Sequence, residues 1–249
     1  MKLDLKIFRL PFIAIFILWF VFWLELKTGL NFARFGIYPK DVSSLFGIVL
    51  SPFIHGDLEH LYNNSIPLFV LLLIMQFFYK KQTYFVIVIG IVLSGMITWL
   101  IGRPSYHIGA SGLIYALVSF IFFKGIVTKN YRLTAVSFVV VFLYGGMLWY
   151  IFPDMKENMS WEGHLGGFIT GLILAFVVET PKEFQKMHSY EWEQPGFNRY
   201  KDPFMKHFDE KGNFVSSPHT HTTTDENIKI TYVFTKEVQK DKSTDKTNL

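Results

Sequence analysis

The sequence predicts an all-α membrane protein, in which six transmembrane helices form one bundle and a polar C-terminal tail follows. Three observations predict this fold class. Hydrophobic residues make up 51% of the 249-residue chain, with 27 Phe, and they gather in long runs. The short segments between these runs carry the basic excess, and the composition turns polar after Glu179. Such runs must be helical in lipid, because an open strand there would leave backbone polar groups unpaired.

The first apolar run, residues 11–26, follows Lys2, Lys6 and Arg9, as the apolar part of a signal peptide would. The run is bulky and aromatic, however, and no cleavage site with small residues follows it. We therefore interpret it as an uncleaved first transmembrane helix. Five later runs predict further helices, several of them shorter than the ~20 residues of a full span. These runs are residues 61–79, 84–101, 111–123, 133–152 and 165–178.

The distribution of basic residues predicts the orientation of the bundle, because cytoplasmic loops of membrane proteins are enriched in Lys and Arg. Basic clusters precede the first run, separate the second from the third, and separate the fourth from the fifth. These clusters are Lys2, Lys6 and Arg9; Lys80 and Lys81; and Lys124, Lys129 and Arg132. An even number of spans then puts both termini in the cytoplasm. We expect a multi-pass protein of a bacterial plasma membrane.

The chain divides into a membrane domain, residues 1–179, and a cytoplasmic, weakly ordered polar tail, residues 180–249. The first part holds 13 Lys and Arg against 9 Asp and Glu, and the tail holds 11 against 11. The net charge of +4 therefore lies between apolar runs, which indicates membrane topology and not nucleic-acid binding. Within the tail, residues 227–238 alternate as one strand would, and the His/Thr tract 218–224 is interpreted as solvated polar sequence and not as a metal site.

Polar side chains open three of the predicted helices, where ionisable groups are costly in lipid and mark candidate functional sites. These clusters are residues 55–64, 109–112 and 163–167, at the starts of the second, fourth and sixth helices. The three helices run in the same direction, so their clusters should share one side of the membrane. Counting ~1.5 Å per residue back from Lys124 puts Ser111 on the order of 10 Å below the outer surface. We expect Asn64 and His164 at a similar depth, around a pocket that admits water.

Ser111 and His164 suit a nucleophile and its general base, because a neutral imidazole can take the hydroxyl proton as the oxygen attacks a carbonyl. No carboxylate is placed to complete a triad, since Glu162 is expected to point into the loop, and the prediction is a dyad. Small residues on one face of the sixth helix permit close approach of the fourth helix. These small residues are Gly163, Gly167 and Gly171, facing the side of the fourth helix that carries Gly112 and Ala116.

Donors for a tetrahedral oxyanion are available at the same helix starts. The backbone N–H of Ser111 opens a helix, and His60 and Asn64 lie one turn apart on one helical face. His55 is expected to brace this cluster, and His107 is expected to be an interfacial loop residue. The chain has no Cys, which excludes a thiolate nucleophile, and we expect no metal or other cofactor.

These residues, in this order and spacing, resemble the motifs of the rhomboid family of intramembrane serine proteases. The resemblance covers about residues 8–179 and leaves the tail unexplained. The matching residues are His55, His60 and Asn64 in the second helix; Gly109, Ser111, Gly112 and Tyr115 in the fourth; and Gly163, His164, Gly167 and Gly171 in the sixth.

The resemblance implies a six-helix rhomboid-like bundle with Ser111 as nucleophile and His164 as general base. It also implies that His60 and Asn64 form the oxyanion hole with the Ser111 N–H, and that Tyr115 packs beneath His164. Substrates of the family are single-span membrane proteins. The loop 153–162 would cap the site and the fifth helix would act as a lateral gate. The physiological substrate and the oligomeric state stay open.

Two alternative functions remain at this point. A catalytically silent rhomboid-like protein would bind membrane proteins without cutting them, although loss of the Ser or the His would then be expected. A small transporter or channel would also carry polar groups within its helices. However, the sequence has neither an internal repeat nor a chain of intramembrane acids suited to ion coupling. A metalloprotease is disfavoured because His55 and His60 do not form a His-Glu-x-x-His motif.

Overall fold

A computed structural model describes residues 5–153, 155, 159–185, 190, 196–198, 201–209 and 211–215. The chain forms two compact units, Met1–Met187 and His188–Leu249. In the described part of the second unit, a short 3-10 helix, η8 (Met205–His207), is followed by a bridge between Phe208 and Phe214. The predicted strand 227–238 and the His/Thr tract 218–224 lie outside the described residues.

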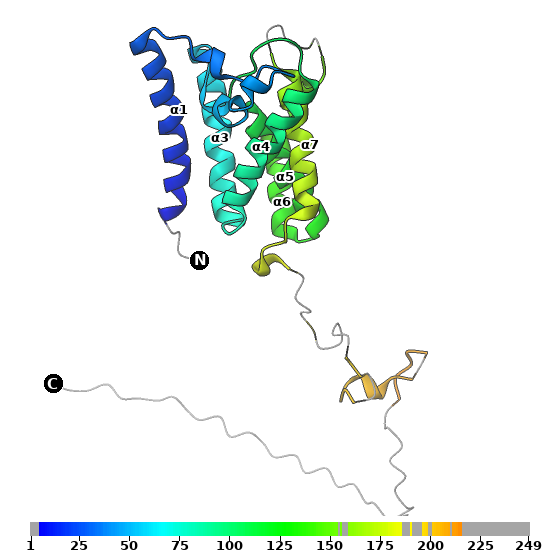
Figure 1. Cartoon of the computed structure of the whole chain (residues 1–249). Coiled ribbons are helices and arrows are strands. Elements are labelled where there is room, and N and C mark those ends of the chain that lie inside the picture. Colours follow the sequence, from blue (N-terminus) through cyan, green and yellow to red (C-terminus); the bar gives the residue numbers. More distant parts are fainter. Residues whose placement is uncertain are drawn as a thin grey trace, which may run out of the picture. The chain divides into compact units, whose positions relative to one another are not determined.

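The first unit is an aligned bundle of helices (Figure 1). Its long helices are α1 (Arg9–Thr28), α3 (Leu58–Phe78), α4 (Thr83–Ile101), α5 (Ser111–Thr128), α6 (Tyr131–Tyr144) and α7 (Trp161–Val177). Short helices fill the loops: η1 (Leu5–Phe8), η2 (Phe32–Phe35), η3 (Val42–Ser44), α2 (Gly47–Leu50), η4 (Ser51–Phe53), η5 (Gly145–Ile151) and η6 (Lys182–Phe184). No strand occurs in the described residues of this unit, which confirms the all-helical class.

Five helical segments are long and apolar enough to cross a membrane. They are Leu5–Thr28, Leu58–Phe78, Thr83–Ile101, Ser111–Thr128 and Tyr131–Ile151. The sixth predicted segment forms α7, which is apolar but has only 17 residues. The multi-pass character of the chain follows from these five segments.

The fifth predicted helix differs from the expectation of one continuous run over residues 133–152. The α-helix α6 ends at Tyr144, and the chain continues as the 3-10 helix η5. Gly145 and Gly146 stand at this change, and glycine is a poor helix former because it loses the most backbone entropy. Two backbone carbonyls of η5, those of Met147 and Tyr150, accept hydrogen bonds from side chains of α5 and α7.

Helix α5 is the centre of the bundle, with 11 of its 18 residues buried and with α4, α6 and α7 packed around it. Glycines allow the closest of these contacts, as the spacing in the sixth predicted helix indicated. A Cβ on Gly167 would lie 2.1 Å from the Gly112 carbonyl oxygen, and one on Gly171 would lie 2.2 Å from the Ala116 oxygen. Only glycine therefore permits this approach of α7 to α5.

The C-terminal end of α7 is held by Lys124 of α5. Its ammonium group donates to the carbonyl of Ala175 at 3.1 Å and to that of Val178. The side chain is only 4% exposed, so Lys124 is a buried cap of α7. A cation at this position also complements the negative end of the helix dipole.

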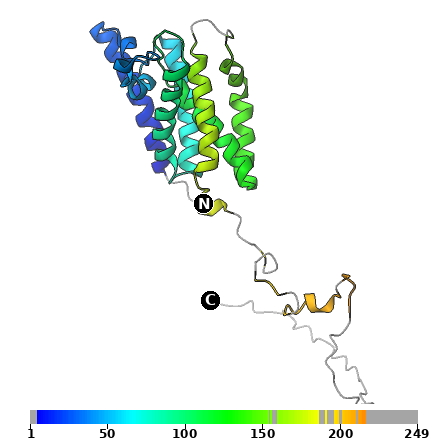
Figure 2. The ribbon, with the colours of Figure 1, turned by 45° about the vertical axis from the view of Figure 1, so that its right-hand side comes forward.

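The helix starts that carry the three predicted polar clusters lie together at one end of the bundle. Figures 1 and 2 show α1 beginning and α7 ending at the same end, while the segment of short helices after α1 lies at the opposite end. Helices α3, α5 and α7 begin at this opposite end, as the predicted common direction of the three helices requires.

Candidate active site

A cavity of about 660 Å³ opens where α3, α5 and α7 begin. The predicted nucleophile, general base and oxyanion donors line it together with Tyr115: these residues are His60, Asn64, Ser111, Tyr115 and His164. His55 and the predicted glycines are not among the lining residues. The structure thus brings the three sequence-predicted clusters to one recess. Of the loop 153–162, expected to cap the site, residues 154 and 156–158 lie outside the described residues, while Met159 and Ser160 line the cavity.

The ring of His164 is fixed by two neighbours. It stacks on Tyr115, with 4.3 Å between ring centroids and 12° between planes, and its Nδ1 lies 2.9 Å from the carbonyl oxygen of Tyr150. A carbonyl only accepts hydrogen bonds, so Nδ1 carries the proton in the neutral ring. The lone pair is then on Nε2, the nitrogen that a general base would use.

Tyr115 is itself anchored by the same 3-10 helix that orients His164. Its hydroxyl donates to the carbonyl oxygen of Met147 at 2.5 Å, and the Tyr115 side chain is buried. Two carbonyls of η5, those of Met147 and Tyr150, therefore set the positions of the Tyr115–His164 stack. Sequence reasoning missed these acceptors because backbone carbonyls leave no signal in residue types.

Ser111 is the first residue of α5. Its N-cap, Ala110, offers no side-chain acceptor, and the first N–H groups of a helix have no acceptor within it. Within the described part of the chain, the Ser111 hydroxyl has no direct hydrogen bond to His164, although both side chains open on the same cavity. Hydrogen bonds between catalytic groups are often long without substrate and tighten when it binds.

The turn before Ser111 is pressed against α3. Gly109 has φ +103°, a conformation that favours glycine, and a Cβ there would lie 2.6 Å from His60 Nε2 and 3.6 Å from Asn64 Nδ2. Asn64 Nδ2 donates to the His60 carbonyl at 3.1 Å, within the same helix. The side chains predicted to bind an oxyanion thus lie directly beside the turn that precedes Ser111, the predicted nucleophile.

His55 supports the turn before Ser111. It is 1% exposed, its ring packs edge-on against His60 at 5.0 Å, and its Nε2 accepts the Ala110 N–H at 3.5 Å. Burial, and to a lesser extent the charge of His60, lowers the pKa of His55 to about 3, while the Phe53 carbonyl and Asp57 act weakly in the opposite direction. His55 is therefore neutral at physiological pH and serves as an acceptor.

The remaining predicted glycines line the seam between α5 and α7 near the site. A Cβ on Gly112 would lie 3.5 Å from the Gly163 carbonyl oxygen, and one on Gly163 would lie 3.0 Å from Ser160 Oγ. These two positions are close but less crowded than Gly167 and Gly171 further along α7. Within the described residues, no group of three His, Cys, Asp or Glu side chains is arranged to hold a metal ion.

Two polar residues differ from their expected surroundings. Glu162 is buried, with 1% exposure, and its Oε1 accepts the N–H of Arg103 in the loop before α5 at 3.1 Å. His107 lies in the loop before α5, as expected, but is buried there: it is 4% exposed, and its Nδ1 lies 2.6 Å from Ser160 Oγ. Their partners lie more than fifty residues away in the chain, which is why local sequence reasoning left both residues in the loops.

Comparison with known proteins identifies the family of the chain. The model of the Rhomboid domain matches residues 42–180 of the chain. An uncharacterized protein of Mycobacterium bovis is 32% identical over 181 residues, which are 70% of this chain and 75% of that protein, and an uncharacterized protein of Mycobacterium tuberculosis H37Rv matches to the same extent.

A more distant relative carries the family name. A protein of Acanthamoeba polyphaga mimivirus named as a rhomboid protein is 25% identical over 146 residues, or 56% of this chain and 79% of that protein. The domain match covers more than half of the chain and includes every polar cluster that lines the cavity. On these grounds the chain belongs to the rhomboid family.

Proposed function

We propose that the chain is an intramembrane serine endopeptidase that hydrolyses peptide bonds in or near transmembrane segments by a Ser111–His164 dyad. The observation that carries the proposal is that Ser111 and His164 line one cavity at the start of three parallel helices, while the Tyr150 carbonyl engages Nδ1 of His164 and leaves the lone pair on Nε2. Family membership supports the same activity. The proposal includes α7 as a sixth span, so that both termini are cytoplasmic.

The reaction begins with attack of Ser111 Oγ on the substrate carbonyl carbon, while His164 Nε2 takes the hydroxyl proton. The new C–O bond converts the carbonyl oxygen to an oxyanion, for which the Ser111 N–H, His60 and Asn64 are donors. The C–N bond then breaks, and His164 returns its proton to the leaving amine. Water repeats the cycle on the acyl-enzyme and frees the serine and the carboxylate product.

Single-span membrane proteins are the proposed substrates. A peptide bond within an intact helix is shielded by its own hydrogen bonds and side chains, so a locally unwound segment must enter the cavity. The volume of about 660 Å³ is sufficient for several side chains and for the hydrolytic water. No cofactor takes part in this mechanism.

Cleavage of a single-span model substrate by the purified protein in liposomes tests the proposal. Ser111→Ala and His164→Ala are expected to abolish cleavage, and a fluorophosphonate probe is expected to label the wild type but neither variant. Ser119→Ala serves as a matched control, because it removes a different hydroxyl that links α5 to α7 through the Phe168 carbonyl at 2.7 Å. It should retain cleavage.

Two outcomes would contradict the proposal. Cleavage that survives Ser111→Ala would show that another group attacks the substrate. A wild-type protein that binds the substrate but neither cleaves it nor reacts with the probe would instead favour a catalytically silent rhomboid-like protein.

A further inference from the structure

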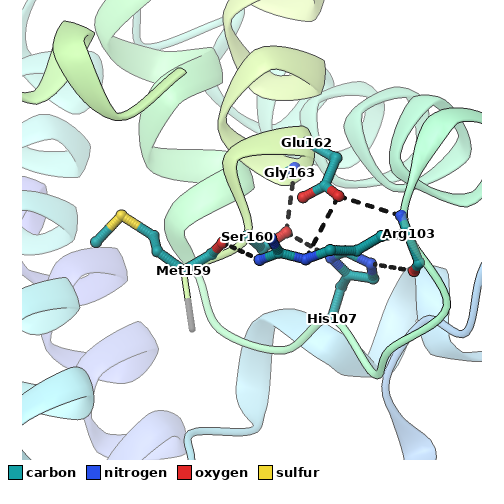
Figure 3. A network of polar contacts seen from close by, with 6 residues as sticks. All are labelled: Arg103, His107, Met159, Ser160, Glu162 and Gly163. Carbon is teal, nitrogen blue, oxygen red and sulfur yellow. Dashed lines mark hydrogen bonds and ion pairs between the residues drawn. The ribbon is translucent and has the colours of Figure 1, made fainter. Parts of the chain in front are cut away.

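A polar network joins the loop before α5 to the start of α7, and the proposed chemistry does not account for it. Figure 3 shows Arg103 and His107 from this loop beside the residues that begin α7. The six residues in the network are Arg103, His107, Met159, Ser160, Glu162 and Gly163. The network connects segments more than fifty residues apart, directly beside the cavity.

His107 is held from three directions. Its Nε2 lies 3.1 Å from the Arg103 carbonyl oxygen, and its Nδ1 lies 2.6 Å from Ser160 Oγ. Its backbone exchanges two hydrogen bonds with Ile37, with N···O distances of 2.8 and 3.0 Å. Since the Arg103 carbonyl can only accept, the ring proton is on Nε2, and Nδ1 must accept the hydroxyl proton of Ser160.

Ser160 continues the network into α7. It is the N-cap of this helix, and its Oγ accepts the Gly163 N–H at 3.2 Å. Its hydroxyl is therefore committed as a donor to His107 and as an acceptor to the first turn of α7. Burial lowers the pKa of His107, whereas the Arg103 carbonyl and Glu162 raise it, and a lowered pKa favours the neutral ring that this pattern requires.

The Arg103–Glu162 pair supports the same junction. Glu162 Oε1 accepts the Arg103 N–H and lies 3.7 Å from the guanidinium Nε, while the guanidinium also donates to the Met159 carbonyl (Figure 3). A carboxylate that is 1% exposed needs a partner, because an unpaired buried charge is strongly destabilising. Arg103 supplies that countercharge and closes the loop onto the start of α7.

The position of the network in the chain relates it to catalysis. His107 lies four residues before Ser111, and Ser160 lies four residues before His164. The His107–Ser160 hydrogen bond thus links the two segments that lead into the proposed nucleophile and base. We propose that His107 and Ser160, braced by Arg103 and Glu162, are positioning residues that set the distance between Ser111 and His164. This inference rests on the proposed protease function.

Three substitutions of His107 separate positioning from simple packing. His107→Phe keeps a ring but removes both hydrogen bonds. His107→Asn puts an amide oxygen near the site of Nδ1 and keeps an acceptor for Ser160, whereas His107→Gln puts an amide nitrogen near the site of Nε2 and keeps only the bond to Arg103. If the link to α7 is what matters, His107→Asn should recover activity and His107→Gln should not.

The expected kinetics follow from misalignment of Ser111 and His164, which must meet during the reaction. His107→Phe should lower kcat and the rate of fluorophosphonate labelling by about 10- to 100-fold, since a shift of 1 Å in a catalytic group costs that much. KM should change less than kcat does, because misalignment of the reacting groups acts on the chemical step more than on substrate binding. His107→Asn should lie within about threefold of wild type in both rates.

Ser160→Ala and Ser119→Ala form a matched pair, since each removes one hydroxyl that links α7 to the loop or helix facing it. Both should lower the thermal unfolding temperature in detergent, but only Ser160→Ala should slow labelling. Wild-type kcat and labelling in both His107→Phe and Ser160→Ala, with cleavage still dependent on Ser111, would overturn the positioning role and leave the protease function standing. An unreactive wild-type protein would overturn both.

Discussion

At the scale of single residues, the orientation of His164 depends on contacts that its own sequence motif does not contain. Ser111, His164, His60 and Asn64 could be singled out because polar and ionisable groups are rare within apolar helices and these fall at three helix starts. The carbonyls of Met147 and Tyr150 could not, since every residue has a carbonyl and only the three-dimensional path of η5 aims these two at Tyr115 and His164.

His55 predicts a pH dependence of stability. Its pKa is about 3 in the folded protein and about 6.5 when unfolded, so the unfolded chain takes up a proton first as the pH falls. The contribution of His55 to stability is therefore complete above about pH 6.5 and is lost progressively from there towards about pH 3.

Unfolding of the purified protein between pH 7 and pH 4 measures this effect. His55→Gln, which keeps a polar side chain without a titrating ring, should make the loss of stability over this range smaller than in the wild type. His107 has a lowered pKa as well and contributes a slope of the same sign in both proteins. Equal slopes for the wild type and His55→Gln would show that His55 is not buried as a neutral ring.

At the scale of helices, the apolar runs predicted where the spans lie, but not how each one ends. The ends of α5 and α6 depend on local backbone chemistry: Lys129 adopts a left-handed conformation after α5, and the Gly145–Gly146 pair turns α6 into η5. The glycine spacing of the sixth helix did predict its close neighbour. Small residues at every fourth position of a transmembrane helix typically mark a close contact with another helix.

The contact between α5 and α7 makes Gly171 intolerant of any side chain. In Gly171→Ala, the new Cβ would lie 2.2 Å from the Ala116 oxygen and 2.7 Å from the Phe120 nitrogen, and these backbone atoms cannot move aside singly. We expect a loss of about 1–3 kcal/mol in the free energy of unfolding, as for overpacked cores.

Thermal unfolding in detergent measures this loss. Gly146→Ala is the control, because it adds the same methyl group at a position where a Cβ would meet no atom of the described residues within 4 Å. Similar unfolding temperatures for both variants would mean that α5 and α7 are not in backbone contact at Gly171.

At the scale of the whole molecule, the charge pattern and the common direction of α3, α5 and α7 lead to one topology. We expect both termini and the loop after α3 in the cytoplasm, and the segment 29–57 outside. The chain has no Cys, so single cysteines report location without background. Single cysteines introduced by Lys81→Cys and by Val42→Cys should react with a membrane-impermeant maleimide from opposite sides of oriented vesicles. Labelling from the same side would contradict the topology.

Lys124 has a consequence for how the molecule responds to its bilayer. The Lys124 ammonium fastens one end of α5 to α7, and the His107–Ser160 bond fastens the loop at the other end, with the glycine seam between them. Two helices pinned at both ends cannot slide past each other. In a thinner or thicker bilayer, α5 and α7 should therefore tilt together as one rigid body. The difference in membrane depth between residues 111 and 164 should then not change with lipid chain length.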